Sequence, residues 1–433
     1  MMKSVLIALG LGFSVASYAE TEPLPDPLTL DYVLDLPAQM DPEFLRQQAM
    51  RMQALSNQGL VRAQDGIELN LLGRVGQREF LGETQDYNMG ALHVGVPLFD
   101  FGRTDSAHQA WLLTEQAEAA RLEAVRDQFR IKLIQAYFNV LLADFKYRVE
   151  NEAMAIAYVT LDKVRENFEL KRVSDAELYQ HEVEYQKAFL KRQKAQADLR
   201  RSRMLLANAM GKPEAIINKL SMPELPKLPE KLLRVEDYLN LAVERNPQLE
   251  AARQALEASG LRIEQAKASK KPVIRADAWV GQLSSYPEIR EGHWHAEVSL
   301  KMPLYDAGLT KSKVEGERAK QQQAQADLFS MEQRIREQVT NLYFELNLLE
   351  VEKQAVDASQ TFAEYNLDYK RGLYENEMQA DLGDAMVYIS QSDYDKLAFD
   401  LKKALLWNQM QVATGVKDLA DYQVEQKSNE VTP

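Results

Sequence analysis

The sequence predicts a protein of mixed class, in which long α-helices are combined with a few short strands suited to a membrane. Three observations support this prediction. Sequence landmarks recur after about 205 residues, some short segments alternate apolar and polar residues, and a helical pattern runs without a break over residues 104–171. The expected class is therefore mixed α and membrane β, with one structural unit present twice.

The repeat is visible in motifs that keep a nearly constant spacing. The segment PLFDFG at Pro97–Gly102 returns as PLYDAG at Pro303–Gly308, 206 residues later. Gly211 returns as Gly415 after 204 residues. Such a small drift indicates a tandem duplication of one unit. We expect a first repeat at residues 20–220, a second at residues 221–415 and a C-terminal tail at residues 416–433.

The N-terminus has the pattern of an export signal. Lys3 precedes an apolar run over residues 5–15, and the small residues Ser17 and Ala19 occupy the positions that a signal peptidase reads. The run is shorter than the ~20 residues of a spanning helix, and no later segment offers a longer one. We predict a signal peptide at residues 1–19.

Composition excludes several classes of protein. A net charge of −13 disfavours binding to nucleic acid, and the absence of cysteine excludes disulfides, thiolate metal sites and cysteine nucleophiles. No nucleophile elbow, phosphate-binding loop, dinucleotide fingerprint or zincin motif is present. We therefore expect no enzyme activity, no catalytic residues, no cofactor and no nucleic-acid partner.

Each repeat is predicted to open with a helix, at residues 41–64 and 235–270. Pro272 ends the second of these patterns because proline lacks a backbone donor and disfavours helix at the residue before it. Asp65 and Gly66 end the first pattern at the equivalent position of the first repeat.

Two strands follow each of these helices. From Trp294 to Met302 apolar and polar residues alternate, which is the period of a strand. Hairpins are expected at about residues 67–98 and 273–304, with polar loops near residues 77–88 and 283–293. The residues predicted to face the membrane are Leu92, Val94, Val96, Trp294, Val298, Leu300 and Met302. A membrane strand of ~9–11 residues has this pattern, and so does a soluble amphipathic hairpin packed on a helix.

Two histidines flank Trp294 in the last strand. His293 and His295 suggest a metal-ligand pair, but no third ligand is evident nearby. Adjacent strand positions point to opposite faces, so we favour a tryptophan at the membrane interface over a metal site.

Long helices follow the strands. Asp100 and Asp306 are predicted N-caps, and the helix from residue 104 to 171 would approach ~100 Å in length. A break near Val173, Ser174 and Asp175 precedes a second helix, and another break is expected near residues 372–379. The composition is that of long coiled coils. We predict long antiparallel helical hairpins at about residues 104–210 and 308–414.

The number of strands has a consequence for assembly. A sheet that spans a membrane must close on itself, and four strands are too few to do so. Several chains would each have to contribute four strands, which gives eight for a dimer and twelve for a trimer.

The repeated PLFDFG and PLYDAG motifs, the helical segments IQAYFNVLLA and TNLYFELNLLE, and the closing ANAMG and QVATG segments resemble the TolC-like outer membrane efflux proteins. The resemblance implies a homotrimer whose twelve-stranded β-barrel lies in the lipid of the outer membrane and continues into a periplasmic α-helical tunnel. It implies a passive exit duct for a tripartite efflux pump or a type I secretion system, with a periplasmic adaptor protein and an inner-membrane pump as partners.

The resemblance also implies where the duct is controlled. ADLGDA at Ala380–Ala385 matches an aspartate pair at the periplasmic entrance of the family, so Asp381 and Asp384 are predicted to ring the entrance and attract cations. Glu377 stands where some members have an arginine, so the details of the closed state are not carried over. The possible adaptor contacts at the first hairpin tip are Val173, Ser174, Asp175 and Leu178. The alternative is a soluble periplasmic coiled-coil scaffold or adaptor, which would have no use for exposed apolar strand faces.

Overall fold

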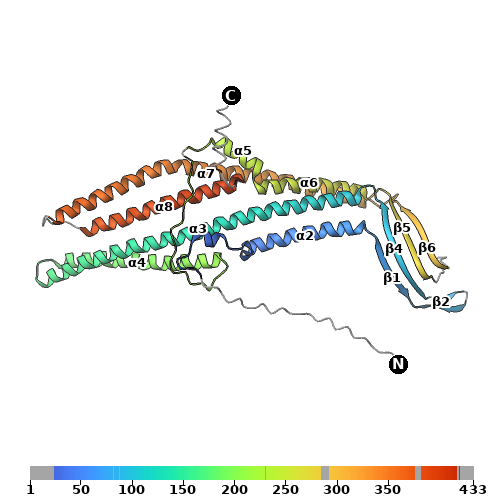
Figure 1. Cartoon of the computed structure of the whole chain (residues 1–433), viewed down its shortest axis with the longest axis horizontal. Coiled ribbons are helices and arrows are strands. Elements are labelled where there is room, and N and C mark those ends of the chain that lie inside the picture. The colour runs from blue at the N-terminus through green and yellow to red at the C-terminus, as the bar shows by residue number, and fades with distance from the viewer. Residues whose placement is uncertain are drawn as a thin grey trace, which may run out of the picture.

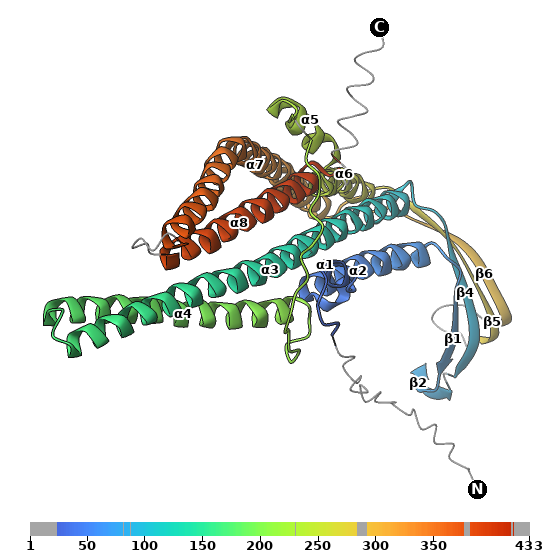
Figure 2. The ribbon, with the colours of Figure 1, turned by 60° about the vertical axis from the view of Figure 1, so that its left-hand side comes forward.

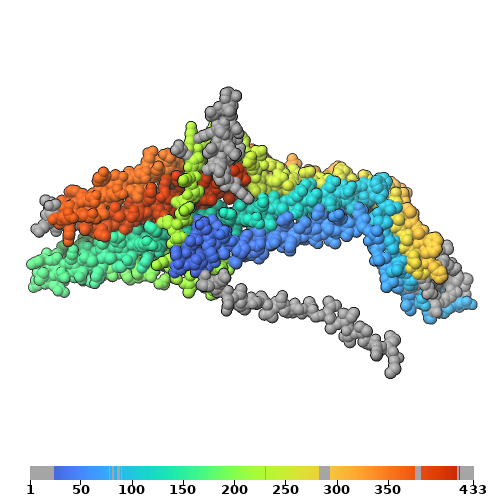
Figure 3. Space-filling model, viewed as in Figure 1, coloured from blue at the N-terminus to red at the C-terminus, as the bar shows by residue number. Residues whose placement is uncertain are grey.

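The computed structural model describes residues 24–80, 82–86, 88–229, 231–283, 292–375, 382–416 and 419. The predicted signal peptide, most of the predicted tail and Asp381 lie outside these residues. The described chain is an elongated body of long helices with a sheet at one end (Figure 1). In the space-filling view the sheet turns away from the long axis of the helices (Figure 3).

The same order of elements occurs in two successive parts of the chain. The first part comprises α2 (Pro42–Gln64), β1 (Glu68–Arg74), β4 (Met89–Phe99), α3 (Arg103–Glu169) and α4 (Asp175–Ala209). The second part comprises α6 (Pro247–Ala268), β5 (Val273–Leu283), β6 (Gly292–Lys301), α7 (Leu309–Glu375) and α8 (Leu382–Thr414). Both α3 and α7 have 67 residues. A duplication would produce this order, and the repeat boundaries stay a prediction.

The long helices turn back on themselves in two pairs. α3 packs against α4, and α7 packs against α8, so each pair forms a hairpin whose tip lies at the end of the body opposite the sheet (Figure 1). α7 continues past Gly372 to Glu375, although the break was predicted to begin at residue 372. One glycine costs a helix only ~1 kcal/mol relative to alanine, which is too little to end it among good helix formers.

The single helix predicted over residues 235–270 is wrong. The structure has two helices, α5 (Val235–Arg245) and α6, which are separated by Asn246. Pro247 is the first residue of α6, where its missing N–H costs nothing. The Asn246 side chain accepts hydrogen bonds from the N–H of Gln248 at 2.9 Å and of Leu249 at 3.3 Å, so it caps the new helix.

Short elements that the sequence did not predict occur before α2 and between β1 and β4. α1 (Leu30–Leu34) and a 3₁₀ turn η1 (Ala38–Met40) precede α2. The loop predicted near residues 77–88 contains a small hairpin of β2 (Gln77–Phe80) and β3 (Glu83–Asp86). Its strands are rich in charged residues and show no apolar alternation, which is why the pattern did not reveal them.

The four longer strands form one antiparallel sheet in the order β1-β4-β5-β6. Glu68 of β1 lies opposite Gly95 of β4, Gly95 lies opposite Asp277 of β5, and Asp277 lies opposite Glu297 of β6. The central pair, β4 and β5, therefore joins the two parts of the chain, and β1 and β6 are the edges.

Two buried clusters hold the middle of the body together. In the first, Tyr137 is fully buried, and its hydroxyl lies 2.9 Å from the carbonyl oxygen of Leu28 and 2.6 Å from that of Ser221. In the second, Trp407 and Tyr238 are buried where α5, α7 and α8 meet. No helix in the described part of the chain has both the length and the apolar composition that crossing a membrane requires.

α4 and α8, the second helices of the two hairpins, are each followed by a glycine with a left-handed backbone conformation. Gly211 follows α4 with a φ of 70°, and Gly415 follows α8 with a φ of 71°. A Cβ on Gly415 would lie 2.3 Å from the carbonyl oxygen of Arg245, at the junction of α5 and α6. The Asn246 side chain donates a hydrogen bond to the carbonyl of Ala413 at 2.9 Å. The end of α8 is therefore fixed directly against the start of α6.

Asp100 holds the start of α3. Its carboxylate accepts hydrogen bonds from the N–H groups of Gly102 at 3.1 Å, Arg103 at 3.1 Å and Thr104 at 2.6 Å, and from the Thr104 hydroxyl. The N-cap position is Gly102, with a φ of 83°, so the predicted N-cap is two residues too early. The predicted side chain nevertheless satisfies the first N–H groups of the helix.

This cap predicts a dependence of stability on pH. Burial raises the pKa of Asp100, but the hydrogen bonds from Thr104, Gly102 and Arg103 outweigh it and hold the pKa below its usual value of 3.8. A carboxyl whose pKa is lowered by folding stabilises the fold above its unfolded pKa, and this stability is lost as the pH falls through the folded pKa. We expect the melting temperature to fall below about pH 3.8, less steeply in Asp100→Asn than in the wild type.

Circular dichroism of the purified protein during heating measures this slope. The matched control is Asp105→Asn, which removes an exposed carboxylate from the same turn. An Asp100→Asn variant with the slope of the wild type would contradict the prediction.

Candidate functional site

One face of the sheet is apolar on all four strands. Across the sheet Leu71 lies opposite Leu92, Leu92 opposite Val280, and Val280 opposite Trp294. Leu71 is 82% exposed and Trp294 is 72% exposed, and the neighbouring positions on this face are also apolar. A large continuous apolar patch on a protein surface marks contact with another protein or with lipid.

The residues predicted to face the membrane lie on this face. Leu92, Val94, Trp294, Val298 and Leu300 are exposed there, and Val96 is half-buried. Met302 is exposed one residue after the end of β6. Their membrane contact itself stays a prediction.

The opposite face of the sheet carries a network of charged groups. Arg275 Nη2 lies 2.7 Å from Glu68 Oε2, and Arg275 Nε lies 2.9 Å from Asp277 Oδ1. Asp277 Oδ1 also lies 3.0 Å from His93 Nε2. A Cβ on Gly95 would come within 2.3 Å of Arg275 Nη2. The glycine therefore leaves the space in which Arg275 passes over β4 to reach β1.

An aromatic group adjoins this network. The Trp279 ring stacks on His93 with a centroid distance of 4.8 Å and lies 5.2 Å from the ring of His295. His295 Nε2 lies 2.9 Å from Glu297 Oε2, on the face opposite to Trp294. Among the described residues, no group of three or more potential ligands is placed to hold a metal ion.

The sequence did not single out Arg275, Asp277 or Trp279. They occupy alternate positions of the predicted strand at residues 273–282, and their polar or amphipathic side chains are the signal that could have identified this second face. The sheet is thus apolar on one side and charged on the other.

The tip of the first hairpin contains the four predicted adaptor contacts. Ser174 caps α4 by accepting a hydrogen bond from the N–H of Glu177 at 3.3 Å. Ser174 and Asp175 are exposed, whereas Val173 and Leu178 are half-buried. These positions are at the far end of the molecule from the sheet.

The second hairpin tip contains one of the two predicted gate residues. Asp384 is exposed in the first turn of α8, where the helix dipole favours a negative charge, and Asp381 lies outside the described residues. Figure 2 shows that both hairpins extend from the same side of the body, away from the sheet. The structure does not test the gate.

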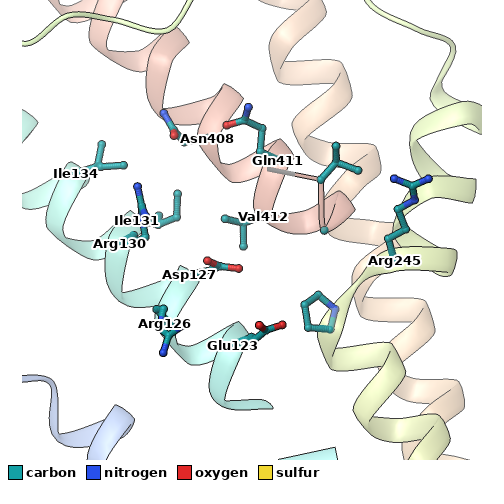
Figure 4. Close-up of a pocket in the computed structure, with 13 residues that line it drawn as sticks. Glu123, Arg126, Asp127, Arg130, Ile131, Ile134, Arg245, Asn408, Gln411 and Val412 are labelled. Carbon is teal, nitrogen blue, oxygen red and sulfur yellow. The ribbon is translucent and has the colours of Figure 1, made fainter. Parts of the chain in front are cut away.

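A pocket of about 420 Å³ lies in the middle of the body, between α3, the junction of α5 and α6, and the end of α8 (Figure 4). Its charged lining residues are Glu123, Arg126, Asp127, Arg130 and Arg245. The described lining has no serine, cysteine, histidine or tyrosine, and its two carboxylates are those of Glu123 and Asp127. We assign no chemistry to this pocket.

Comparison with known proteins finds a family match over part of the chain and a shared fold. Residues 238–415 match the family described as outer membrane efflux protein. No curated protein sequence matches the chain. Several solved structures have a similar fold, and three outer membrane proteins are among them. The CmeC channel of Campylobacter jejuni is 14% identical, with a TM-score of 0.74 over 93% of this chain and 89% of that chain.

VceC of Vibrio cholerae is 15% identical, with a TM-score of 0.73 over 89% of this chain and 96% of that chain. The MtrE channel of Neisseria gonorrhoeae is 20% identical, with a TM-score of 0.69 over 89% of each chain. At these identities the solved structures show the fold alone, and the family match covers the second part of the chain. The second part of the chain is therefore similar to the outer membrane efflux proteins, and the chain shares its fold with solved outer membrane channels.

Proposed function

We propose that this protein is a homotrimeric outer membrane channel. Three chains would each contribute four strands to a twelve-stranded barrel, and their helical hairpins would form a periplasmic tunnel. The observation that carries this proposal is the sheet with one apolar, exposed face and one charged face. Such a sheet suits a wall with lipid outside and water inside.

The edges of the sheet support the assembly of several chains. β1 and β6 each have one side without a neighbouring strand in the described chain. In lipid an open edge leaves backbone N–H and C=O groups unsatisfied, and each such group costs several kcal/mol. Pairing of these edges between copies would close the sheet, and a single chain with four strands would not.

The channel would act as a passive exit duct. We propose that it serves a tripartite efflux pump or a type I secretion system, together with a periplasmic adaptor protein and an inner-membrane pump. The family match supports an efflux role. The adaptor is proposed to contact the tip of the first hairpin, because this tip lies at the end of the body farthest from the sheet. The tip residues are Val173, Ser174, Asp175 and Leu178. The tandem duplication and its boundaries belong to the same proposal.

Fractionation of cells that express the full sequence tests the proposal. We expect the protein in the outer membrane fraction, extractable only with detergent, as a trimer by native mass spectrometry and with ion conductance in planar bilayers. A monomer that is recovered without detergent in the periplasmic extract would instead support the soluble scaffold.

The gate makes a separate prediction. Asp381 and Asp384, each present three times in a trimer, would place two rings of carboxylates at the periplasmic entrance and attract cations. We expect the double variant Asp381→Ala/Asp384→Ala to lower the cation-over-anion permeability ratio, measured from reversal potentials under a salt gradient. The control is Asp393→Ala/Asp395→Ala, which removes two carboxylates farther along α8. Unchanged selectivity in the gate variant would remove the assignment.

A further inference from the structure

The two edge strands of the sheet define the surface through which copies of the chain would pair. β1 is antiparallel to β4, β4 to β5, and β5 to β6, so β1 and β6 run in opposite directions. β6 of one copy can therefore continue the sheet onto β1 of the next as an antiparallel pair. Resting on the proposed trimer, we infer one register for this pair, in which Lys301 lies opposite Glu68 of the next chain.

The two faces of the sheet restrict the possible registers. On β6 the apolar face holds Trp294, Val298 and Leu300, and on β1 it holds Leu69 and Leu71. Residues directly opposite each other point to the same face, and a slip by one residue would turn the apolar side chains of one strand to the charged face. Only registers that differ by two residues are therefore allowed.

The tilt of strands in a barrel sets the size of the displacement. Within one chain, a line of directly opposite residues runs across the sheet from Glu68 of β1 to Glu297 of β6. If this line of opposite residues continued unchanged into the next chain, Glu297 would lie opposite Glu68 of that chain. The strands would then have no tilt relative to the barrel axis. Strands in barrels tilt by ~35–45°, lie ~4.8 Å apart and rise ~3.3 Å per residue, so four strands need a displacement of roughly four to six residues per chain.

The lengths of β1 and β6 determine the direction of this displacement and favour about four residues over about six. A displacement of about four residues toward the C-terminus places Lys301 opposite Glu68, and all seven residues of β1 then lie opposite β6. The same displacement toward the N-terminus places His293 opposite Glu68, and within the described residues only Glu68 and Leu69 then lie opposite β6. A displacement of about six residues places Pro303 opposite Glu68, beyond the end of β6 and without an N–H to donate.

The side chains agree with this register. Lys301 and Glu68 carry opposite charges, whereas the untilted register would place Glu297 opposite Glu68, and like charges at opposite positions destabilise a sheet. The Glu68 side chain is 54% exposed although it contacts Arg275, so its carboxylate is accessible to a second cation. On the apolar face Val298 comes to lie opposite Leu71, which pairs two apolar side chains.

Disulfide formation between chains tests the register, because the protein has no cysteine of its own. Four double variants combine Leu71→Cys with Trp294→Cys, Ala296→Cys, Val298→Cys or Leu300→Cys, which correspond to displacements of zero, two, four and six residues. Opposite residues have Cβ atoms ~4.5–5.5 Å apart, close to disulfide distance, whereas diagonal neighbours are ~7–8 Å apart. We expect Leu71→Cys/Val298→Cys to give several-fold more covalent dimer and trimer on non-reducing gels than the other three.

Each single-cysteine variant serves as a control and should give no covalent oligomer above background. Strongest cross-linking with a partner other than residue 298 would overturn the register and leave the trimer standing. A trimer without cross-links in any double variant would overturn the pairing of β6 with β1. Native mass spectrometry of the cysteine-free protein measures the trimer separately, so a failure of the proposed function is recognised by itself.

Discussion

Val298→Arg is expected to remove most of the stable trimer from the outer membrane. Val298 is 70% exposed on the apolar face of β6, which we propose to lie against lipid. An arginine on the lipid face costs ~2–4 kcal/mol near the middle of a bilayer, and a trimer would carry three of them. We expect at least a tenfold loss of trimer, measured by semi-native electrophoresis of the membrane fraction.

The matched control places the same residue on the other face of the same strand. His295→Arg puts an arginine beside Glu297, where His295 already makes a contact of 2.9 Å. This variant should keep about the wild-type amount of trimer. Equal losses in the two variants would mean that the apolar face is not the membrane face.

Gly415→Ala is expected to destabilise the helical body strongly. Gly415 has a φ of 71°, and a left-handed conformation costs an alanine ~1–2 kcal/mol. The added Cβ would also lie 2.3 Å from the Arg245 carbonyl oxygen, so the junction of α5 and α6 would have to move. Overpacking of this kind costs a further ~1–3 kcal/mol. The melting temperature followed by circular dichroism should fall clearly.

Gly308→Ala separates the two contributions to this loss. Gly308 has a φ of 85°, and a Cβ there would meet no atom within 4 Å. This control has only the conformational cost and should lower the melting temperature much less. If both variants melt at the same temperature, the contact between Gly415 and Arg245 does not support the fold.

Sequence patterns predicted those elements whose signals are local. The strand at β6 was visible because Trp294, Val298 and Leu300 alternate with polar residues, and the helix at α3 because nothing interrupts its pattern before the break at Val173. The division of the helix at Asn246 could also have been predicted, since an asparagine before a proline is a common start of a helix. The charged hairpin of β2 and β3 had no such signal.

Contacts between distant parts of the chain could not be predicted in this way. Arg275 reaches Glu68 only because β5 lies beside β4 and Gly95 leaves room for its side chain. Neither condition can be deduced from the spacing of residues along one strand. The same holds for the direct contact between the end of α8 and the start of α6. The predicted gate depended on a resemblance to the family, and Asp384 is the described part of it.

The position of β5 beside β4 also determines the order in which the sheet can form. His93 and Asp277, which contact each other across these strands, are 184 residues apart in the chain. Each helical hairpin can form from segments that are close in sequence. The pair of β4 and β5 can form only after the first helical hairpin and α6, which separate the two strands in the chain, have been synthesised. Contacts of long sequence separation form slowly. We therefore expect the exposed apolar surface of the sheet to form late, after the helices have folded, which shortens the time during which an unassembled chain could aggregate.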